Sequence, residues 1–175
     1  MKKFKLTSEF IVDISGVKLF RIKALIEFGN VKAGDLGGYI EKEENLSHMG
    51  DAWVSDDARI SGNAQVFGNA QVFGNAQVFG NARVFGNAWV FGDAQVSGNA
   101  RVFGDKDYAY AHGFGSCNRT TTFFRLKDGD VGVRCGCFYG TLAQFRDKVC
   151  ETHGETKKAQ EYLMLADLME IRFKN

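Results

Sequence analysis

The chain contains no proline among its 175 residues, and its formal net charge is only +1. Because proline cannot donate a backbone hydrogen bond, its absence favours ladders of paired strands. The near-zero charge gives no strong field that would attract DNA, RNA or an acidic membrane surface. We therefore expect neither a nucleic-acid polymer nor a membrane as a partner.

Long hydrophobic runs are also missing. No stretch approaches the roughly 18 apolar residues of a membrane span, and MKKFKLTSEF has no apolar run after its basic residues, so it is not a signal peptide. Cysteines in a chain without such a signal are typical of free thiols in a reducing compartment. The sequence thus predicts a cytoplasmic protein. The cysteines are Cys117, Cys135, Cys137 and Cys150.

A six-residue repeat dominates the middle of the chain, from Ala52 to Asp105. Each unit reads Ala-x-(Val/Ile)-(Phe/Ser)-(Gly/Asp)-(Asn/Asp), and such internal periodicity outranks other signals of fold. The units begin at Ala52, Ala58, Ala64, Ala70, Ala76, Ala82, Ala88, Ala94 and Ala100.

Each unit has the chemistry of a very short strand followed by a corner. Side chains alternate between faces along a strand, so Ala64 and Val66 point one way and Gln65 points the other. The Gly68-Asn69 pair suits a corner because both residues tolerate positive φ. Six residues are therefore enough for one side of a prism with a narrow interior of alanine and valine.

This pattern resembles the hexapeptide-repeat family, whose signature is a small residue two positions before an aliphatic one, as in Ala64-Gln65-Val66. The resemblance implies a left-handed parallel β-helix in which three hexads make one triangular coil, so that residues 18 apart stack. The expected fold is mainly β: about three coils, preceded by an N-terminal hairpin cap and followed by a small α+β domain. The expected boundaries are 1–50, 51–105 and 106–175.

Six phenylalanines follow valines in the repeat and must point out of the prism. Each can bury roughly 150–250 Å², and a soluble monomer rarely exposes an apolar patch beyond a few hundred Å². Either the flanking segments or other subunits cover them. Because three coils give a prism only about 14 Å tall, we favour a homo-oligomer, and the resemblance implies a trimer. The six are Phe67, Phe73, Phe79, Phe85, Phe91 and Phe103.

The flanking segments carry clear local signals. Residues 10–14 and 17–22 alternate around Ser15-Gly16, which predicts a hairpin, and residues 34–47 look like a degenerate first coil or cap. Residues 120–126 and 131–135 predict a second hairpin. Thr141 and Gln144 form a capping box before a helix that ends at Gly154, and a second helix is expected from about Thr156 to Ile171.

The whole layout resembles a group of phage and gut-bacterial repeat proteins that carries no established activity. The shared segments are Val31–Ile40, the hexads, Thr121–Phe124, Cys135–Thr141 and Glu151–Gly154. The resemblance therefore implies the order of the parts and a phage setting, rather than a reaction.

The best candidate site is the segment Gly136–Thr141, interpreted as a glycine-bearing loop that leads into a helix. Backbone N–H groups and a helix N-terminus favour an anion there, and Tyr139 offers a ring to stack on a base. An ordinary strand-to-helix turn with surface arginines explains the same residues and stays open as an alternative. The predicted ligand-binding residues are Arg119, Thr121, Arg134, Gly136, Tyr139, Gly140 and Thr141.

A second candidate location lies on the outer faces of the hexads. Arg83 and Arg101 share one stacked column and Trp89 lies in another, so these side chains could line a cleft between subunits. A packed oligomer interface is the alternative explanation. We include Arg83, Arg101 and Trp89 among the predicted ligand-binding residues.

Catalysis and metal binding are not expected. The acyltransferases of the hexapeptide class typically carry a catalytic histidine in or beside the coils, whereas these nine hexads contain no histidine and no insertion. Cys135 and Cys137, with Cys117 and His112, do not have the spacing of a zinc knuckle, so buried thiols are favoured over a metal. No cofactor is predicted.

The resulting hypothesis is a non-enzymatic, oligomeric binding protein for a phosphate-bearing small molecule such as a nucleotide. The phage resemblance suggests an anti-defence role, as a sponge for a nucleotide immune signal. A hexapeptide-class acyltransferase and a purely structural or protein-binding assembly are the alternatives.

Overall fold

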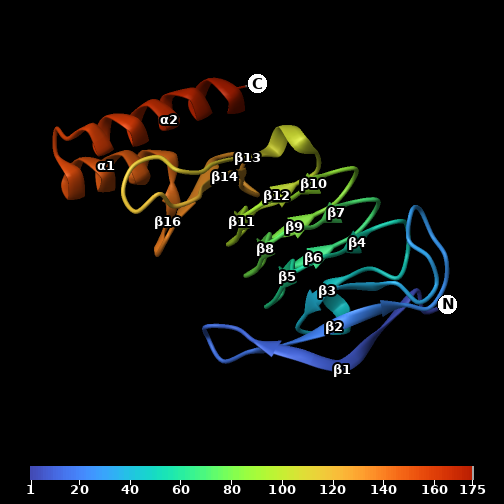
Figure 1. The fold of residues 1–175 in the computed structure, drawn as a ribbon. Helices are drawn as coiled ribbons and strands as arrows, with labels where there is room; N and C mark the ends of the chain where they lie inside the picture. Colours follow the sequence, from blue (N-terminus) through green and yellow to red (C-terminus); the bar gives the residue numbers. More distant parts are fainter. Residues whose placement is uncertain (175) are drawn as a thin grey trace.

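The computed structural model describes residues 1–174. It consists of a hairpin at one end, a β-solenoid in the middle, and a small sheet with two helices at the other end (Figure 1). Each hexad forms one two-residue strand, as the repeat predicts. These strands are β4 (Trp53–Val54), β5 (Arg59–Ile60), β6 (Gln65–Val66), β7 (Gln71–Val72), β8 (Gln77–Val78), β9 (Arg83–Val84), β10 (Trp89–Val90), β11 (Gln95–Val96) and β12 (Arg101–Val102).

The strands stack in parallel on three faces, with residues 18 apart in register. Trp89 pairs with Gln71, which pairs with Trp53, and the same spacing joins the strands of the other two faces. The predicted columns of the prism are thus confirmed. The faces have the orders β3-β5-β8-β11, β4-β7-β10 and β6-β9-β12, where β3 spans Leu36–Ile40.

The interior of the solenoid is the alanine and aliphatic residue of every hexad, each at most 1% exposed. Glycine is needed at the corners: Gly68 has a φ of 71°, and a Cβ there would lie 3.1 Å from the backbone nitrogen of Gly86 in the next coil. Asparagine side chains run up the corners as amide ladders, for example from Asn69 to Asn87 at 3.1 Å.

The N-terminal segment caps the solenoid and adds one coil to it. Strands β1 (Phe4–Val12) and β2 (Lys18–Ala24) form the predicted hairpin, and β2 pairs with β3. After the short 3₁₀ helix η1 (Glu43–Asn45), Leu46 bridges Val66 in parallel. The buried Asn45 amide donates to the carbonyls of Gly62 and Ala64. Residues 36–54 therefore make a complete first turn, and the face β3-β5-β8-β11 has four rungs.

The C-terminal part begins with η2 (Asp105–Asp107) and continues as an antiparallel sheet. Its strands are β13 (Tyr108–Ala111), β14 (Thr121–Arg125), β15 (Val131–Cys135) and β16 (Phe138–Thr141), in that order. Alternation gives the sheet two apolar faces. Phe124 and Tyr108 belong to the core of the solenoid, whereas Phe123 and Val133 pack with the helices.

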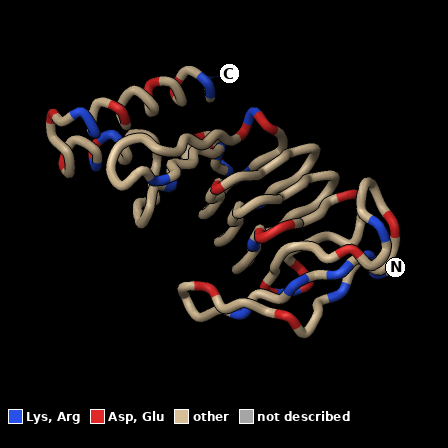
Figure 2. Tube along the Cα trace, in the orientation of Figure 1, with Lys and Arg blue, Asp and Glu red and all other residues tan. Residues whose placement is uncertain are grey.

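Two helices cover the outer face of this sheet. Helix α1 (Leu142–His153) begins at the predicted capping box and has Gly154 as its C-cap, and helix α2 (Lys157–Phe173) begins after Thr156. Neither described helix has the length and apolar character to cross a membrane. Charged residues gather in the hairpin and the helices, and few lie on the hexad strands (Figure 2).

The segment Gly136–Thr141 differs from the prediction of a loop. Gly136 and Cys137 make a two-residue turn, and Phe138–Thr141 is strand β16, paired with β15 through Cys135 and Phe138. Gly136 allows this tight reversal because it has a φ of 58°. The backbone of residues 138–141 therefore belongs to a sheet edge and does not form a loop around an anion.

Candidate functional site

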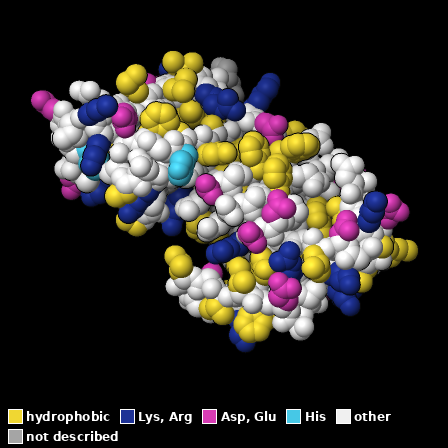
Figure 3. Space-filling model, viewed as in Figure 1, with side chains coloured by type: hydrophobic (Ala, Val, Ile, Leu, Met, Phe, Trp, Pro, Cys, Tyr) yellow, Lys and Arg dark blue, Asp and Glu magenta, His cyan; other side chains and the backbone are white. Residues whose placement is uncertain are grey.

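A cleft lies across the outer side of the face β5-β8-β11, between the two ends of the molecule. The tip of the β1-β2 hairpin forms one lip, and the turn between β15 and β16 forms the other (Figure 1). In the space-filling view the molecule is notched between the hairpin lobe and the helical lobe (Figure 3). The cleft has a volume of about 390 Å³, within the range of small-molecule sites.

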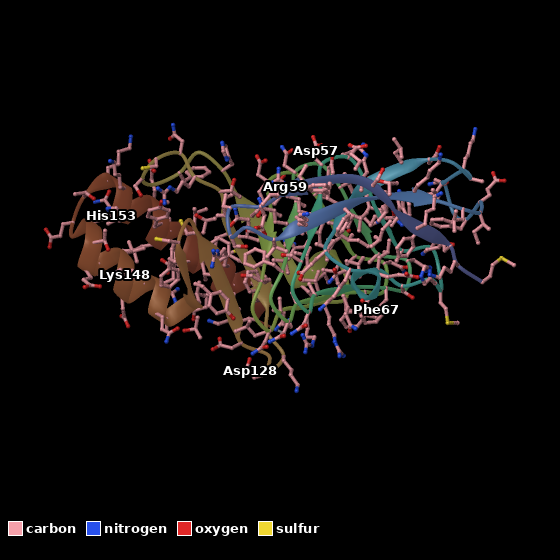
Figure 4. All side chains as sticks on the ribbon, turned by 90° about the horizontal axis from the view of Figure 1, so that it is seen from below. Asp57, Arg59, Phe67, Asp128, Lys148 and His153 are labelled. Atoms are coloured by element: carbon pink, nitrogen blue, oxygen red, sulfur yellow. The ribbon has the colours of Figure 1, made fainter. Side chains whose placement is uncertain are left out.

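The floor of the cleft is the outward column of the second face of the prism. Arg59, Gln77 and Gln95 occupy successive rungs of this column, because they stand 18 residues apart. Arg59 lies beside the hairpin, whereas Phe67 lies on another side of the prism (Figure 4). The backbone N–H of Gln95 donates to the Thr122 hydroxyl at 2.9 Å, which joins the floor to the C-terminal sheet.

Arg134 forms the upper wall of the cleft. It projects from β15 toward the solenoid and lies over the ring of Phe79, 5.2 Å from its centroid. Its Nε is buried and has no hydrogen-bond partner within residues 1–174. An unpaired buried donor costs roughly 1–3 kcal/mol. Because the Nε atom itself is covered, the terminal N–H groups of the half-buried guanidinium are the donors that a ligand would meet.

Positive charge predominates among the residues that line the cleft. Arg59 and Arg134 make no side-chain hydrogen bond or ion pair within the part of the chain that the structure describes. The one lining carboxylate, Asp13, already accepts from Ser15 and from the Val17 backbone, and these hydrogen bonds lower its pKa. Two free guanidinium groups and the amides of two glutamines can therefore bind a phosphate or carboxylate.

The predicted residues around the Gly136 turn separate to opposite sides of the sheet. Arg134 and Gly136 line the cleft. Arg119 lies on the side of the helices, beside Phe145 and Tyr162. It is so close to Gly136 that a side chain at position 136 would collide with its guanidinium group. Thr121 is buried, and its hydroxyl donates to the Cys135 sulfur at 3.3 Å, so it does not face a ligand.

Tyr139, Gly140 and Thr141 have local structural roles. Tyr139 pairs with Arg134 across the strands and stacks on Phe124 with ring centroids 6.4 Å apart, against the end of the solenoid. The Thr141 hydroxyl accepts from the backbone of Gln144, as the capping box requires, and Gly140 leaves room for the Gln144 side chain.

The predicted residues of the hexads lie on the two other faces of the prism. Arg83 and Arg101 are neighbours on β9 and β12, where partial burial and the nearby Arg83 lower the pKa of Arg101. Trp89 lies on β10 of the remaining face. Within one chain, therefore, only Arg134 and Gly136 of the predicted residues contribute to the cleft.

Sequence reasoning missed several residues of the cleft: Arg59, Ser61, Gln77, Phe79 and Gln95. The 18-residue spacing already places Arg59, Gln77 and Gln95 in one outward column, and this was the available signal. What the sequence did not indicate is that the hairpin tip and the β15–β16 turn both reach this column.

The alternative zinc site does not assemble in the described part of the chain. The structure brings no three His, Cys, Asp or Glu side chains of residues 1–174 into a group that could hold a metal ion. Cys135 instead contacts the hydroxyls of Thr121 and Tyr162, and all four cysteines are free thiols. The expectation of buried thiols is wrong, because Cys135 is half-buried and Cys137 is exposed.

The parallel ladders and the buried alanine-valine interior define the chain as a β-solenoid repeat protein. In agreement, residues 58–74, 76–92 and 94–105 match the family described as the YdcK beta solenoid repeat. No curated protein matches the chain.

Proposed function

We propose that this protein is a non-enzymatic binding protein that captures a phosphate-bearing small molecule in the cleft between the hairpin and the C-terminal sheet. The observation that carries the proposal is the Arg134 side chain, which lines the cleft, lies over Phe79 and has no hydrogen-bond partner within residues 1–174. Arg59 supplies a second guanidinium group in the same cleft. Charge-assisted hydrogen bonds from arginine are among the strongest that proteins offer to phosphate.

The cleft favours a small ligand over a polymer. The floor spans three rungs, from Arg59 to Gln95, and the hairpin tip closes one side of it. Gln77, Gln95 and Ser61 can donate to or accept from the rest of the ligand. A nucleotide is the class that the phage resemblance favours, and sequestration of a nucleotide immune signal is the specific role that we propose to test.

Two substitutions test the site, and the repeat itself provides matched controls. Glutamine occupies the position of Arg59 in the hexads of Gln77 and Gln95, so R59Q is compatible with the solenoid. R83Q is equally compatible and lies on another face. We expect R59Q and R134Q each to weaken binding by about 10- to 100-fold, since each removes roughly 1.5–3 kcal/mol, and R83Q to have no effect.

Calorimetric titration with inorganic phosphate, mononucleotides and cyclic dinucleotides measures the affinity of each variant. Saturable binding that is lost in R59Q and R134Q but kept in R83Q supports the proposal. Absence of binding to every probe, or equal affinity in R134Q and the parent protein, overturns it. Turnover of an acyl donor by the purified protein would instead support the transferase alternative.

The stacked phenylalanines support a second property, self-association. Phe67 and Phe85 stack at 5.0 Å, Phe103 adds to them at 5.3 Å, and Phe103 is 61% exposed. Within residues 1–174 no other ring contacts this column. We propose that it is covered by other copies of the chain in a trimer, which places Arg83 and Arg101 beside the interface.

A further inference from the structure

A second hollow, of about 480 Å³, lies on the face β4-β7-β10. It exists because the N-terminal segment around Phe28 covers only the first rung of this face. The ring of Phe28 packs edge-on against Trp53, with centroids 5.4 Å apart, and leaves Trp53 only 5% exposed. Two rungs further, Trp89 has no such cover and is 54% exposed. The residues 29–31 form the wall facing it.

Trp89 forms an aromatic platform at the edge of this hollow. Its ring stands edge-on to Phe73, with centroids 6.0 Å apart and planes at 81°. Its backbone N–H donates to the Asp105 carboxylate at 3.0 Å. An exposed indole that rests against a neighbouring ring, on a hydrogen-bonded backbone, offers a flat apolar face to a ligand.

Polar groups with unused hydrogen-bonding capacity surround the platform. Asn87 accepts from Asn69 through its Oδ1, while its own NH₂ group has no acceptor within the described chain. The NH₂ group of Gln71 is engaged by two backbone carbonyls, which leaves its Oε1 as an acceptor. Asp51 adds a carboxylate at the rim. The hollow thus presents both a donor and acceptors beside an aromatic face.

The charge of the hollow differs from that of the cleft. Asp51 is the one ionisable residue among those that line it. The buried ammonium group of Lys3 lies near enough to Asp51 for the carboxylate to raise the pKa of the lysine, against the larger lowering that burial causes. The positive charge of Lys3 therefore offsets part of the negative charge of Asp51. The hollow favours neither an anionic nor a cationic ligand.

We propose that this hollow binds a neutral sugar ring of the pyranose type. Such a ring has an apolar C–H face that packs on an indole, and its rim of hydroxyls both donates and accepts, as Asn87, Gln71 and Asp51 require. The site is independent of the cationic cleft, because the two lie on different faces of the prism.

The experiment uses Trp89 as its own reporter. The chain has two tryptophans, so W53F leaves Trp89 as the single indole. Probes are glucose, galactose, mannose and N-acetylglucosamine, as methyl glycosides and as trisaccharides, with glycerol as the control. We expect a saturable change in indole emission with at least one of these sugars and none with glycerol.

Saturation-transfer NMR on the intact chain provides the matched comparison. W89Q is compatible with the repeat, because Gln71 and Gln95 occupy the same hexad position, and it should abolish the sugar signal. R134Q should retain it, which separates this site from the proposed phosphate cleft. Absence of a saturable response to every sugar up to about 100 mM, where even weak specific binding is visible, overturns the proposal. A fall in the oligomeric mass of W89Q would also overturn it, since Trp89 would then be an interface residue.

Discussion

At the scale of single residues, the most unusual side chain is Lys3, which is 1% exposed. Its ammonium group donates to the carbonyls of Gly50 and Ala52, at 3.1 and 2.7 Å, and lies 4.5 Å from the centre of the Phe28 ring. These contacts fasten the N-terminus to the corner of the first coil. The sequence did not indicate this role, because a lysine near a chain end is ordinarily solvated.

The burial of Lys3 predicts a specific dependence of stability on pH. Burial lowers its pKa from 10.5 to about 8. Between these two values the unfolded chain binds more protons than the folded one, so the free energy of unfolding rises with pH across this window. Below about pH 8 the lysine is protonated in both states and the full cost of burying the charge is present.

We expect the contribution of Lys3 to rise by about 1–2 kcal/mol between pH 8 and pH 10.5, after allowance for solvent screening. Urea unfolding of the parent protein and of K3M at several pH values in this range gives the free energy of unfolding of each. The parent protein should show a steeper rise of this free energy with pH than K3M. The variant K2M, at the neighbouring exposed position, is the control and should keep the rise. Parallel curves for K3M and the parent would show that the ammonium group is not desolvated.

At the scale of elements, the hexads were predicted in detail, whereas the C-terminal sheet was predicted only in part. Each hexad repeats the same local chemistry, so the position of every strand follows from periodicity. The 18-residue register was implied by the resemblance to the hexapeptide-repeat family, in which three hexads make one coil. The sequence also predicted the β14–β15 hairpin and the start of both helices, whereas α2 ends at Phe173, two residues beyond the expected end. It did not indicate that the sheet has one face on the solenoid, because Phe123 and Phe124 are alike in chemistry and differ only in the side they face.

The cap of α1 provides a test at this scale. The Thr141 hydroxyl accepts from the Gln144 backbone, and the Gln144 side chain accepts from the Thr141 backbone. We expect T141A to lower the free energy of unfolding by about 1 kcal/mol, because two helix-end donors depend on this pair. T152A, at an exposed position near the end of the same helix, should change stability by less. Thermal unfolding of both variants checks the difference, and an unchanged T141A would mean that Thr141 contributes nothing as a cap.

At the scale of the whole molecule, the cleft depends on the meeting of two distant segments. The hairpin tip at Asp13–Ser15 precedes the hexads and the turn at Gly136 follows them, and the solenoid fixes the distance between the two. Local patterns predicted each segment, but the height of the stack and the direction of the hairpin decide whether they face one column. The left-handed sense of the coil and the trimer remain predictions from the resemblance.

The trimer can be tested with substitutions that the repeat already uses. Serine replaces phenylalanine after the aliphatic residue in three hexads, at Ser55, Ser61 and Ser97, so a change to serine is compatible with the coil. We expect the triple variant F67S/F85S/F103S to be monomeric, since it removes the column of phenylalanines that has no other aromatic neighbour within residues 1–174. F73S/F91S alters a stacked pair on another face and should keep the trimer mass.

Native mass spectrometry and sedimentation measure the mass of the parent protein and of both variants. A monomeric parent protein would mean that the exposed column is tolerated in solution. If F73S/F91S dissociated the trimer and the triple variant did not, the interface would lie on the face of Trp89.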